Sequence, residues 1–176
     1  MKVKRLLIGC GLILWLTGCA SSPFFPNNGQ VVKSETEFGV LKAEPDVYKG
    51  GTVKLAARIV SVEPSKQGTL VVAEWLPYPQ SEYDGPEDIG WVSKGLVAVY
   101  YPDKLDAEGS LYGNKFLAIG KMVGVTDSQS KLPYMTARCL HVWKTGAADI
   151  GDSADEYDIS EERYCAENNP KSPKVS

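Results

Sequence analysis

The sequence is poor in the groups that enzymes and metal sites most often use. Its 176 residues contain one histidine, His141, and four cysteines, none of them in a Cys-x-x-Cys pair. Two cysteines and a lone histidine would need a fourth ligand to hold zinc, so we expect no metal site. A glycine-rich phosphate-binding loop is also missing. These gaps argue against zinc-dependent and nucleotide-dependent chemistry.

The N-terminus lacks an apolar run long enough to span a membrane. Its apolar run covers residues 6–16, about 11 residues, whereas a transmembrane helix needs roughly 20. Lys2, Lys4 and Arg5 precede the run, and Thr17 and Gly18 follow it. A short apolar run between basic and small residues is typical of a cleaved secretory signal, so residues 1–18 are expected to be a signal peptide and not a membrane anchor.

The tetrapeptide that ends the signal resembles the lipobox of bacterial lipoproteins. It reads Leu16-Thr17-Gly18-Cys19, which places the expected cleavage between Gly18 and Cys19. A thiolate is the nucleophile that can take up a diacylglycerol, and cleavage frees the amine of Cys19 for a further acyl chain such as palmitate. Two or three chains make a stable attachment where one does not. Ala20 and Ser21 stand where an aspartate would retain an enterobacterial lipoprotein in the inner membrane, which favours the outer membrane.

The length of the mature chain indicates a single domain, and its net negative charge disfavours binding to nucleic acid. Cleavage takes away three of the 19 basic residues and none of the 22 acidic ones, which leaves 158 residues with a net charge of about −6. A chain of that length suits a single domain with its own core. Since Cys19 carries lipid, Cys139 and Cys165 remain as a pair in an oxidising compartment, and we expect them to form a disulfide.

Composition divides the mature chain into three parts. Residues 19–33 are rich in Ser, Pro, Asn and Gly and are expected to form a lipidated, flexible tether. Residues 34–145 form the predicted folded domain, and 146–176 form an acidic tail that we expect to be partly disordered. Cys165 indicates that part of this tail is held against the strand that contains Cys139. The acidic residues of the tail are Asp149, Asp152, Asp155, Glu156, Asp158, Glu161, Glu162 and Glu167.

Strand patterns dominate the predicted domain. Val53, Leu55, Ala57 and Ile59 alternate with polar or small residues within 52–62, which predicts a half-buried strand. Further strands are predicted at 69–76, 95–101, 115–125 and 134–143, with a sixth at 38–42 and short helical turns at 44–48 and 104–109. Five or six mostly antiparallel strands in so short a chain bury their faces by curling into a barrel. The predicted fold is therefore all-β, a small OB-like barrel.

The order of several motifs resembles the Slp family of Gram-negative outer-membrane lipoproteins over residues 36–145. Two departures stand out: Ala56-Ala57 replaces a frequent Gly-Gly pair, and Leu76-Pro77-Tyr78-Pro79 replaces Leu-Pro-Leu-Asp. The resemblance implies an envelope location and an association with starvation or stress, and it supplies no catalytic residues. The matching motifs are 45–50 (PDVYKG), 74–77 (EWLP), Gly95, Tyr112, Asn114, Gly120, Gly124 and 141–143 (HVW).

Few residues are candidates for catalysis. A general base needs a titratable side chain within reach of its substrate, and His141 beside Trp143 on a strand is better explained as a packing residue. A pair among four carboxylates of one loop would suit a glycosidase, yet carboxylates in a Gly- and Pro-containing loop are usually solvated. We therefore expect no enzymatic activity, with a hydrolase as a distant alternative. The four carboxylates are Glu82, Asp84, Glu87 and Asp88.

Aromatic residues of the same loop are the candidates for binding. Trp75, Tyr78, Tyr83 and Trp91 flank three prolines, and exposed rings there could stack on sugars or pack on a protein. Alternatively, Trp75 and Trp91 belong to the core. The sequence thus favours a non-catalytic structural or interaction module, with a periplasmic binder of sugar or peptidoglycan second. Its expected partners are the membrane, through the lipid, and envelope proteins or cell-wall components, with no nucleic acid and no cofactor. The domain is expected to face the periplasm.

The lipobox makes a direct prediction about the mature N-terminus. Mass spectrometry of the membrane-extracted protein should find a chain that begins at Cys19 and carries acyl chains, because the thiol and the new amine are both acylated. A Cys19→Ser variant should lose the lipid mass and the membrane attachment. Recovery of an unmodified Cys19, or of both proteins in the same soluble fraction, would contradict the prediction.

Overall fold

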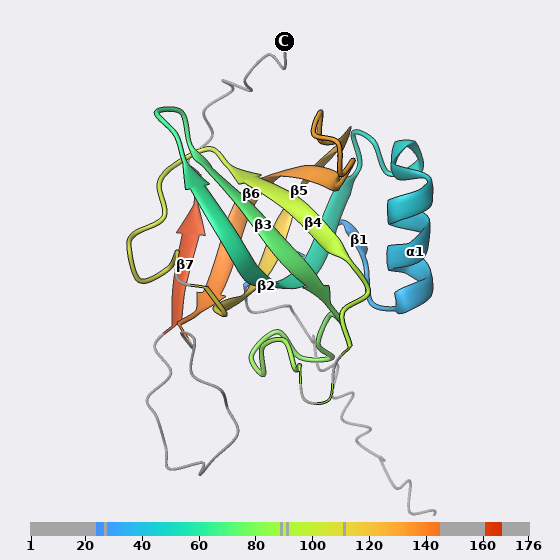
Figure 1. Ribbon diagram of the computed structural model, residues 1–176. Helices are drawn as coiled ribbons and strands as arrows, with labels where there is room; N and C mark the ends of the chain where they lie inside the picture. Colours follow the sequence, from blue (N-terminus) through green and yellow to red (C-terminus); the bar gives the residue numbers. More distant parts are fainter. Residues whose placement is uncertain are drawn as a thin grey trace, which may run out of the picture.

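A computed structural model describes residues 24–26, 28–88, 90, 92–110, 112–144 and 161–166, so Cys19 and Trp91 lie outside the described residues. Five strands close into a barrel, with one helix at its side (Figure 1). In the described part of the chain, no helix is long and apolar enough to cross a bilayer. The barrel strands are β2 (Thr52–Pro64), β3 (Thr69–Leu76), β4 (Leu96–Tyr101), β5 (Lys115–Val125) and β6 (Pro133–Trp143).

The strand order confirms the predicted OB-like barrel. Around the barrel the order is β2-β3-β4-β6-β5, and β5 returns to β2. All neighbours are antiparallel except β4 and β6, which are parallel. A five-stranded Greek-key barrel of this kind is the OB architecture. The five long strands lie within two residues of the predicted bounds because each is a run of β-branched, aromatic and other apolar residues between turn-forming segments.

Strand β2 closes the barrel because it pairs on both of its edges. Residues 52–58 pair with β5, and residues 56–64 pair with β3. A register shift between Ile59 and Ser61 bends the strand between its two partners. On β5, a second register shift follows Ile119, and a Cβ atom on Gly120 would clash with the carbonyl oxygen of Thr136. Glycine is therefore required at position 120, where the backbone of β6 leaves no room for a side chain.

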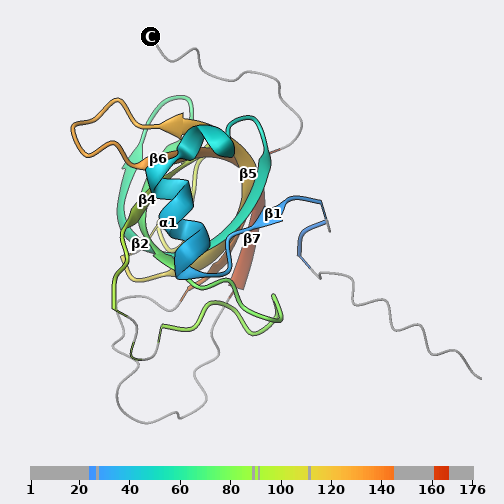
Figure 2. The ribbon, with the colours of Figure 1, turned by 90° about the vertical axis from the view of Figure 1, so that its right-hand side faces the viewer.

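The predicted sixth strand at 38–42 is wrong, because these residues belong to helix α1 (Glu35–Ala43). Ser34 and Glu37 form a capping box, which satisfies two backbone N–H groups at the start of the helix. Figure 2 shows α1 lying across one open end of the barrel. There the ring of Phe38 stacks on Trp75 with 4.7 Å between centroids. The helix therefore supplies the apolar cover that this end of the barrel needs.

Both predicted helical turns fall at turns of the chain. The first is the short 3-10 helix η1 (Pro45–Val47), which confirms the expectation for 44–48. The second, at 104–109, is not helical; it is a turn in which Asp106 accepts a hydrogen bond from the backbone of Gly109. A carboxylate that bonds to nearby backbone competes with helix formation, which accounts for the difference.

The folded domain begins before residue 34, which corrects the predicted boundary of the tether. Strand β1 (Gln30–Val31) pairs in parallel with β2, and Val32 is completely buried. Phe25 is also only 2% exposed, in a second apolar cluster outside the barrel with Leu117 and Trp143. Burial of these large side chains outweighs the turn-forming composition around them. Residues 24–26 and 28–33 are thus part of the fold.

Part of the acidic tail is a strand, as Cys165 indicated. Strand β7 (Glu161–Cys165) pairs antiparallel with β6, and its last residue lies directly opposite Cys139. The two cysteines form a disulfide with their Cα atoms 4.1 Å apart. The bond lies beside the second apolar cluster. Expected disorder elsewhere in 146–176 falls on residues outside those described, apart from Ala166.

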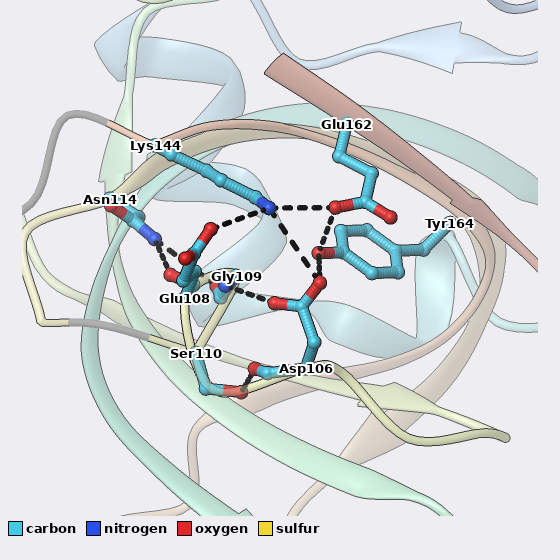
Figure 3. A network of polar contacts seen from close by, with 8 residues as sticks. All are labelled: Asp106, Glu108, Gly109, Ser110, Asn114, Lys144, Glu162 and Tyr164. Carbon is cyan, nitrogen blue, oxygen red and sulfur yellow. Dashed lines mark hydrogen bonds and ion pairs between the residues drawn. The ribbon is translucent and has the colours of Figure 1, made fainter. Parts of the chain in front are cut away.

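A polar network closes the side of the barrel away from α1 (Figures 1 and 3). The ammonium of Lys144 lies 2.8 Å from Glu162, 3.2 Å from Glu108 and 3.6 Å from Asp106. Its pKa is raised, first by the hydrogen bond to Glu162. The hydroxyl of Tyr164 donates to Asp106 at 2.9 Å. These contacts hold the β4–β5 loop against β7, so Leu105 and Tyr164 can pack on the core.

The disulfide should stabilise the domain by fixing β7. Replacing both cysteines by alanine should lower the free energy of unfolding by about 3 to 4 kcal/mol, because a link across 26 residues restricts the unfolded chain. Urea unfolding followed by fluorescence would measure the change. Reduction should cause a similar loss in the wild type and none in the double variant. Equal midpoints for the oxidised and reduced wild type would contradict the prediction.

Candidate functional site

The loop that the sequence marks as a binding surface lies mostly against the domain. Trp75 is completely buried and stacks on Phe38, so it belongs to the core, which was the alternative considered for it. Tyr78 is half-buried, and its hydroxyl donates to Glu82 at 2.6 Å. Tyr83 is 68% exposed. Since Trp91 is outside the described residues, Tyr83 is the predicted aromatic that the structure leaves open to solvent.

The carboxylate of Glu82 organises this loop. It lies 3.2 Å from the ammonium of Lys54 on β2, and both side chains are at most 7% exposed. It also accepts hydrogen bonds from Tyr78 and from the backbone N–H of Phe25, the latter at 3.3 Å. One carboxylate therefore ties together three segments far apart in the sequence. We call the group Phe24, Phe25, Lys54, Tyr78, Glu82, Tyr83 and His141 the N-terminal clasp.

An aromatic layer completes the N-terminal clasp. The ring of Phe24 stacks on His141 with 3.7 Å between centroids and meets Tyr83 edge-on at 5.3 Å. Trp143 approaches Phe24 edge-on at 6.0 Å. Such geometries add to the area that the rings bury. Phe24 and Phe25 are thus held by the loop on one side and by β6 on the other.

Burial shapes the electrostatics of the N-terminal clasp. Burial of the Tyr78 hydroxyl, together with its hydrogen bond to Glu82, raises the pKa of this tyrosine well above its usual range. Tyr78 therefore remains a neutral hydrogen-bond donor at physiological pH. A buried charge is costly unless paired, so Lys54 and Glu82 each require the other. This group is suited to holding the chain rigidly in place.

A second ion-pair group holds the far part of the loop. Arg58 on β2 bonds to Glu74 through Nε at 3.2 Å and through a second nitrogen, and it reaches Asp88 at 3.0 Å. Lys115 on β5 pairs with the same Asp88 at 2.8 Å. The hydrogen bond to Glu74 raises the pKa of Arg58. Asp88 thus fastens the loop to the seam between β2 and β5.

These contacts correct the expectation that the four loop carboxylates are solvated. Glu82 and Asp88 are paired with cations and largely buried, whereas Asp84 and Glu87 are exposed. Burial follows from the buried cations of β2 and β5, which attract partners from the loop. Sequence reasoning missed Lys54 as a clasp residue, although a lysine inside an apolar strand is itself a signal, because lysines are rarely buried unpaired.

His141 packs as the sequence predicted. It is 4% exposed, lies edge-on to Trp143 at 4.5 Å and is covered by Phe24. Its Nε2 lies 2.9 Å from a carboxylate oxygen of Glu161 on β7. The described residues contain no group of three histidine, cysteine, aspartate or glutamate side chains placed to hold a metal.

A groove lies between the second half of β2 and the β4–β5 loop. Its volume is about 440 Å³, within the range of pockets that hold small molecules. Val60, Val62, Leu105 and Tyr112 give it an apolar lining, and Tyr112 is 65% exposed. The wall also includes Ser61, Lys104 and Ser110. The groove could accept a small amphipathic ligand.

The N-terminal clasp predicts an asymmetric response to mutation. Glu82→Ala should lower the free energy of unfolding by about 3 to 5 kcal/mol, because it leaves the charge of Lys54 buried without its partner. The double variant Lys54→Met/Glu82→Leu should be more stable than Glu82→Ala. Chemical denaturation would measure both. Asp84→Ala, an exposed neighbour, is the control and should change stability by less than about 0.5 kcal/mol. Equal effects of Glu82→Ala and Asp84→Ala would contradict the assignment.

Comparison with known proteins identifies the family of the chain. The model of the outer membrane lipoprotein Slp family matches residues 16–168. Searches of the curated proteins and of the solved structures each found no match. The family match begins within the lipobox and extends through β7, so it spans the barrel, the N-terminal clasp and the disulfide. The chain therefore belongs to the outer membrane lipoprotein Slp family.

Proposed function

We propose that the mature protein is a non-catalytic module that acyl chains on Cys19 attach to the outer membrane. In this proposal its barrel faces the periplasm and acts by contact with envelope proteins or cell-wall components, under the starvation or stress conditions that the family resemblance implies. The lipobox and the family match support the anchor and the membrane. The non-catalytic role is supported by the polar side chains of the β3–β4 loop, several of which bond to other parts of the domain.

The N-terminal clasp is the observation that carries this proposal. Phe24 and Phe25 follow the expected lipidation site by five and six positions, and both are packed against the barrel. Glu82 and Tyr78, which could have served as functional groups in the loop, are engaged in holding this segment. A domain fixed so close to its lipid has a defined position at the membrane. That geometry suits a protein whose role depends on where it is held.

Two of the carboxylates that a catalytic pair would need have structural partners. Asp88 bonds to Arg58 and Lys115, and Glu82 bonds to Lys54. A general acid in a glycosidase must instead present its carboxyl to the substrate. These pairings support the non-catalytic interpretation over the hydrolase.

A second candidate function is the binding of a cell-wall or sugar ligand. The groove along β2 favours it, because an apolar wall that includes the exposed Tyr112 lies beside hydroxyl and amine groups. Tyrosine rings of this kind stack on sugar faces while nearby polar groups fix orientation. This site differs from the loop that the sequence suggested.

The proposal predicts that function in the cell requires the lipid anchor on Cys19 but does not require the exposed carboxylates of the loop. In cells that lack the protein, Cys19→Ser should fail to restore the wild-type envelope cross-links and survival in starvation. Asp84→Asn/Glu87→Gln should restore both, because these exposed groups have no catalytic role. Fractionation and immunoblotting would control for level and location. A double variant that is anchored and folded but inactive would overturn the non-catalytic assignment.

A further inference from the structure

Only a short stretch of chain separates the expected lipid from the folded domain. Five residues of fully extended chain, each with a reach of at most about 3.6 Å, place the Cα atom of Cys19 within about 18 Å of that of Phe24. A folded domain of about 100 residues has a radius of gyration of about 13 Å, so its diameter exceeds this reach. The membrane must therefore lie against the side of the domain that carries Phe24.

The residues where the lipidated segment joins the domain, Phe24 and Phe25, are fixed on the barrel by side-chain and backbone contacts. Phe24 stacks on His141 and meets Tyr83 edge-on, and the backbone N–H of Phe25 donates to Glu82. In Figures 1 and 2 the β3–β4 loop lies at the lower edge of the barrel, and the described N-terminal residues meet this loop where Phe24 contacts Tyr83. The turn between β2 and β3 and the loop between β5 and β6 lie at the upper edge in both views. The lipid and the β3–β4 loop thus share one side.

This side exposes apolar side chains beside the attachment point. Tyr83, in contact with Phe24, is 68% exposed, and Val92 in the same loop is 70% exposed. Tyrosine is enriched at membrane interfaces because its ring is apolar and its hydroxyl is polar. Among the described residues of this loop, the exposed charges next to Tyr83 are the carboxylates of Asp84 and Glu87, and the exposed Lys94 farther along is paired with Glu35, so charge does not draw this surface to anionic lipid.

We infer that the domain rests on the bilayer through its β3–β4 loop, with the ring of Tyr83 at the level of the lipid headgroups. The acyl chains bring the surfaces together, and Tyr83 and Phe24 fix the orientation. The turn at residues 65–68 and the loop at 126–132 then point away from the membrane. This inference rests on the proposed acylation of Cys19 and adds to it the side of the domain that meets the lipid.

Fluorescence quenching by lipid would test the orientation on the full mature lipoprotein. Variants Asp84→Cys and Ser128→Cys, both at exposed positions, would each offer one free thiol, since Cys139 and Cys165 are in the disulfide and Cys19 carries lipid. Each would carry an environment-sensitive label and be reconstituted into phosphatidylcholine vesicles with brominated acyl chains. We expect quenching of the label at residue 84 and none at residue 128. Replacing part of the lipid by phosphatidylglycerol, or adding salt, should leave the result unchanged.

A pair of tyrosine variants tests the role of the ring. In the Asp84→Cys background, Tyr83→Ser should reduce quenching of the label, while Tyr112→Ser should not, although the two tyrosines are about equally exposed at 68% and 65%. Tyr112 lies by the groove on β2 and serves as the matched control. Equal effects of the two substitutions would overturn the assignment to Tyr83.

Anchoring and orientation fail in different ways in this experiment. If the protein floats with the vesicles but the label at residue 84 is not quenched, the proposed orientation is wrong and the anchor stands. The same holds if the protein floats and both labels are quenched alike. Protein that does not float with the vesicles overturns the anchor and the orientation together. Floating vesicles with quenching only at residue 84 support both.

Discussion

Closure of the sheet by β2 is the constraint on which the other features of the domain depend. One strand must pair with β5 over 52–58 and with β3 over 56–64, which requires a long strand that bends at its bulge. A closed five-stranded barrel has two open ends and an outer wall that is apolar in places. Helix α1 covers one end, and Leu105 with Tyr164 covers the other. Phe25 covers the outer wall, which is why the N-terminal segment is part of the fold.

Sequence pattern predicted the barrel well because the composition of a strand is a local property. Each of the five long strands has its own run of β-branched and aromatic residues, and these alone place it within two residues. Helix α1 was missed because its apolar positions, Phe38 and Leu41, are few. The capping box of Ser34 and Glu37 was the available signal for a helix start. The inclusion of residues before 34 in the fold was also predictable, because the adjacent Phe24 and Phe25 are large apolar residues among turn-forming ones.

The candidate site was less predictable, because its contacts join distant parts of the chain. Glu82 meets Lys54 across 28 residues and Phe25 across 57. Nothing local in the loop shows that its carboxylate has a buried cation to pair with, so composition alone suggested a solvated recognition loop. The exposure of Tyr83 and the burial of Trp75 likewise depend on where α1 and Phe24 lie. Only the packing role of His141 followed from its immediate neighbours.

The link between β6 and β7 has a consequence for the order of events in the cell. All strands that close the barrel precede β7 in the chain, so closure does not wait for the bond between Cys139 and Cys165. Thiols stay reduced in the cytoplasm, and the bond forms only in an oxidising compartment. The covalently complete domain therefore exists only after secretion. The disulfide distinguishes a molecule that has been exported from one that has not, and a thiol-reactive reagent applied to whole cells would separate the two populations.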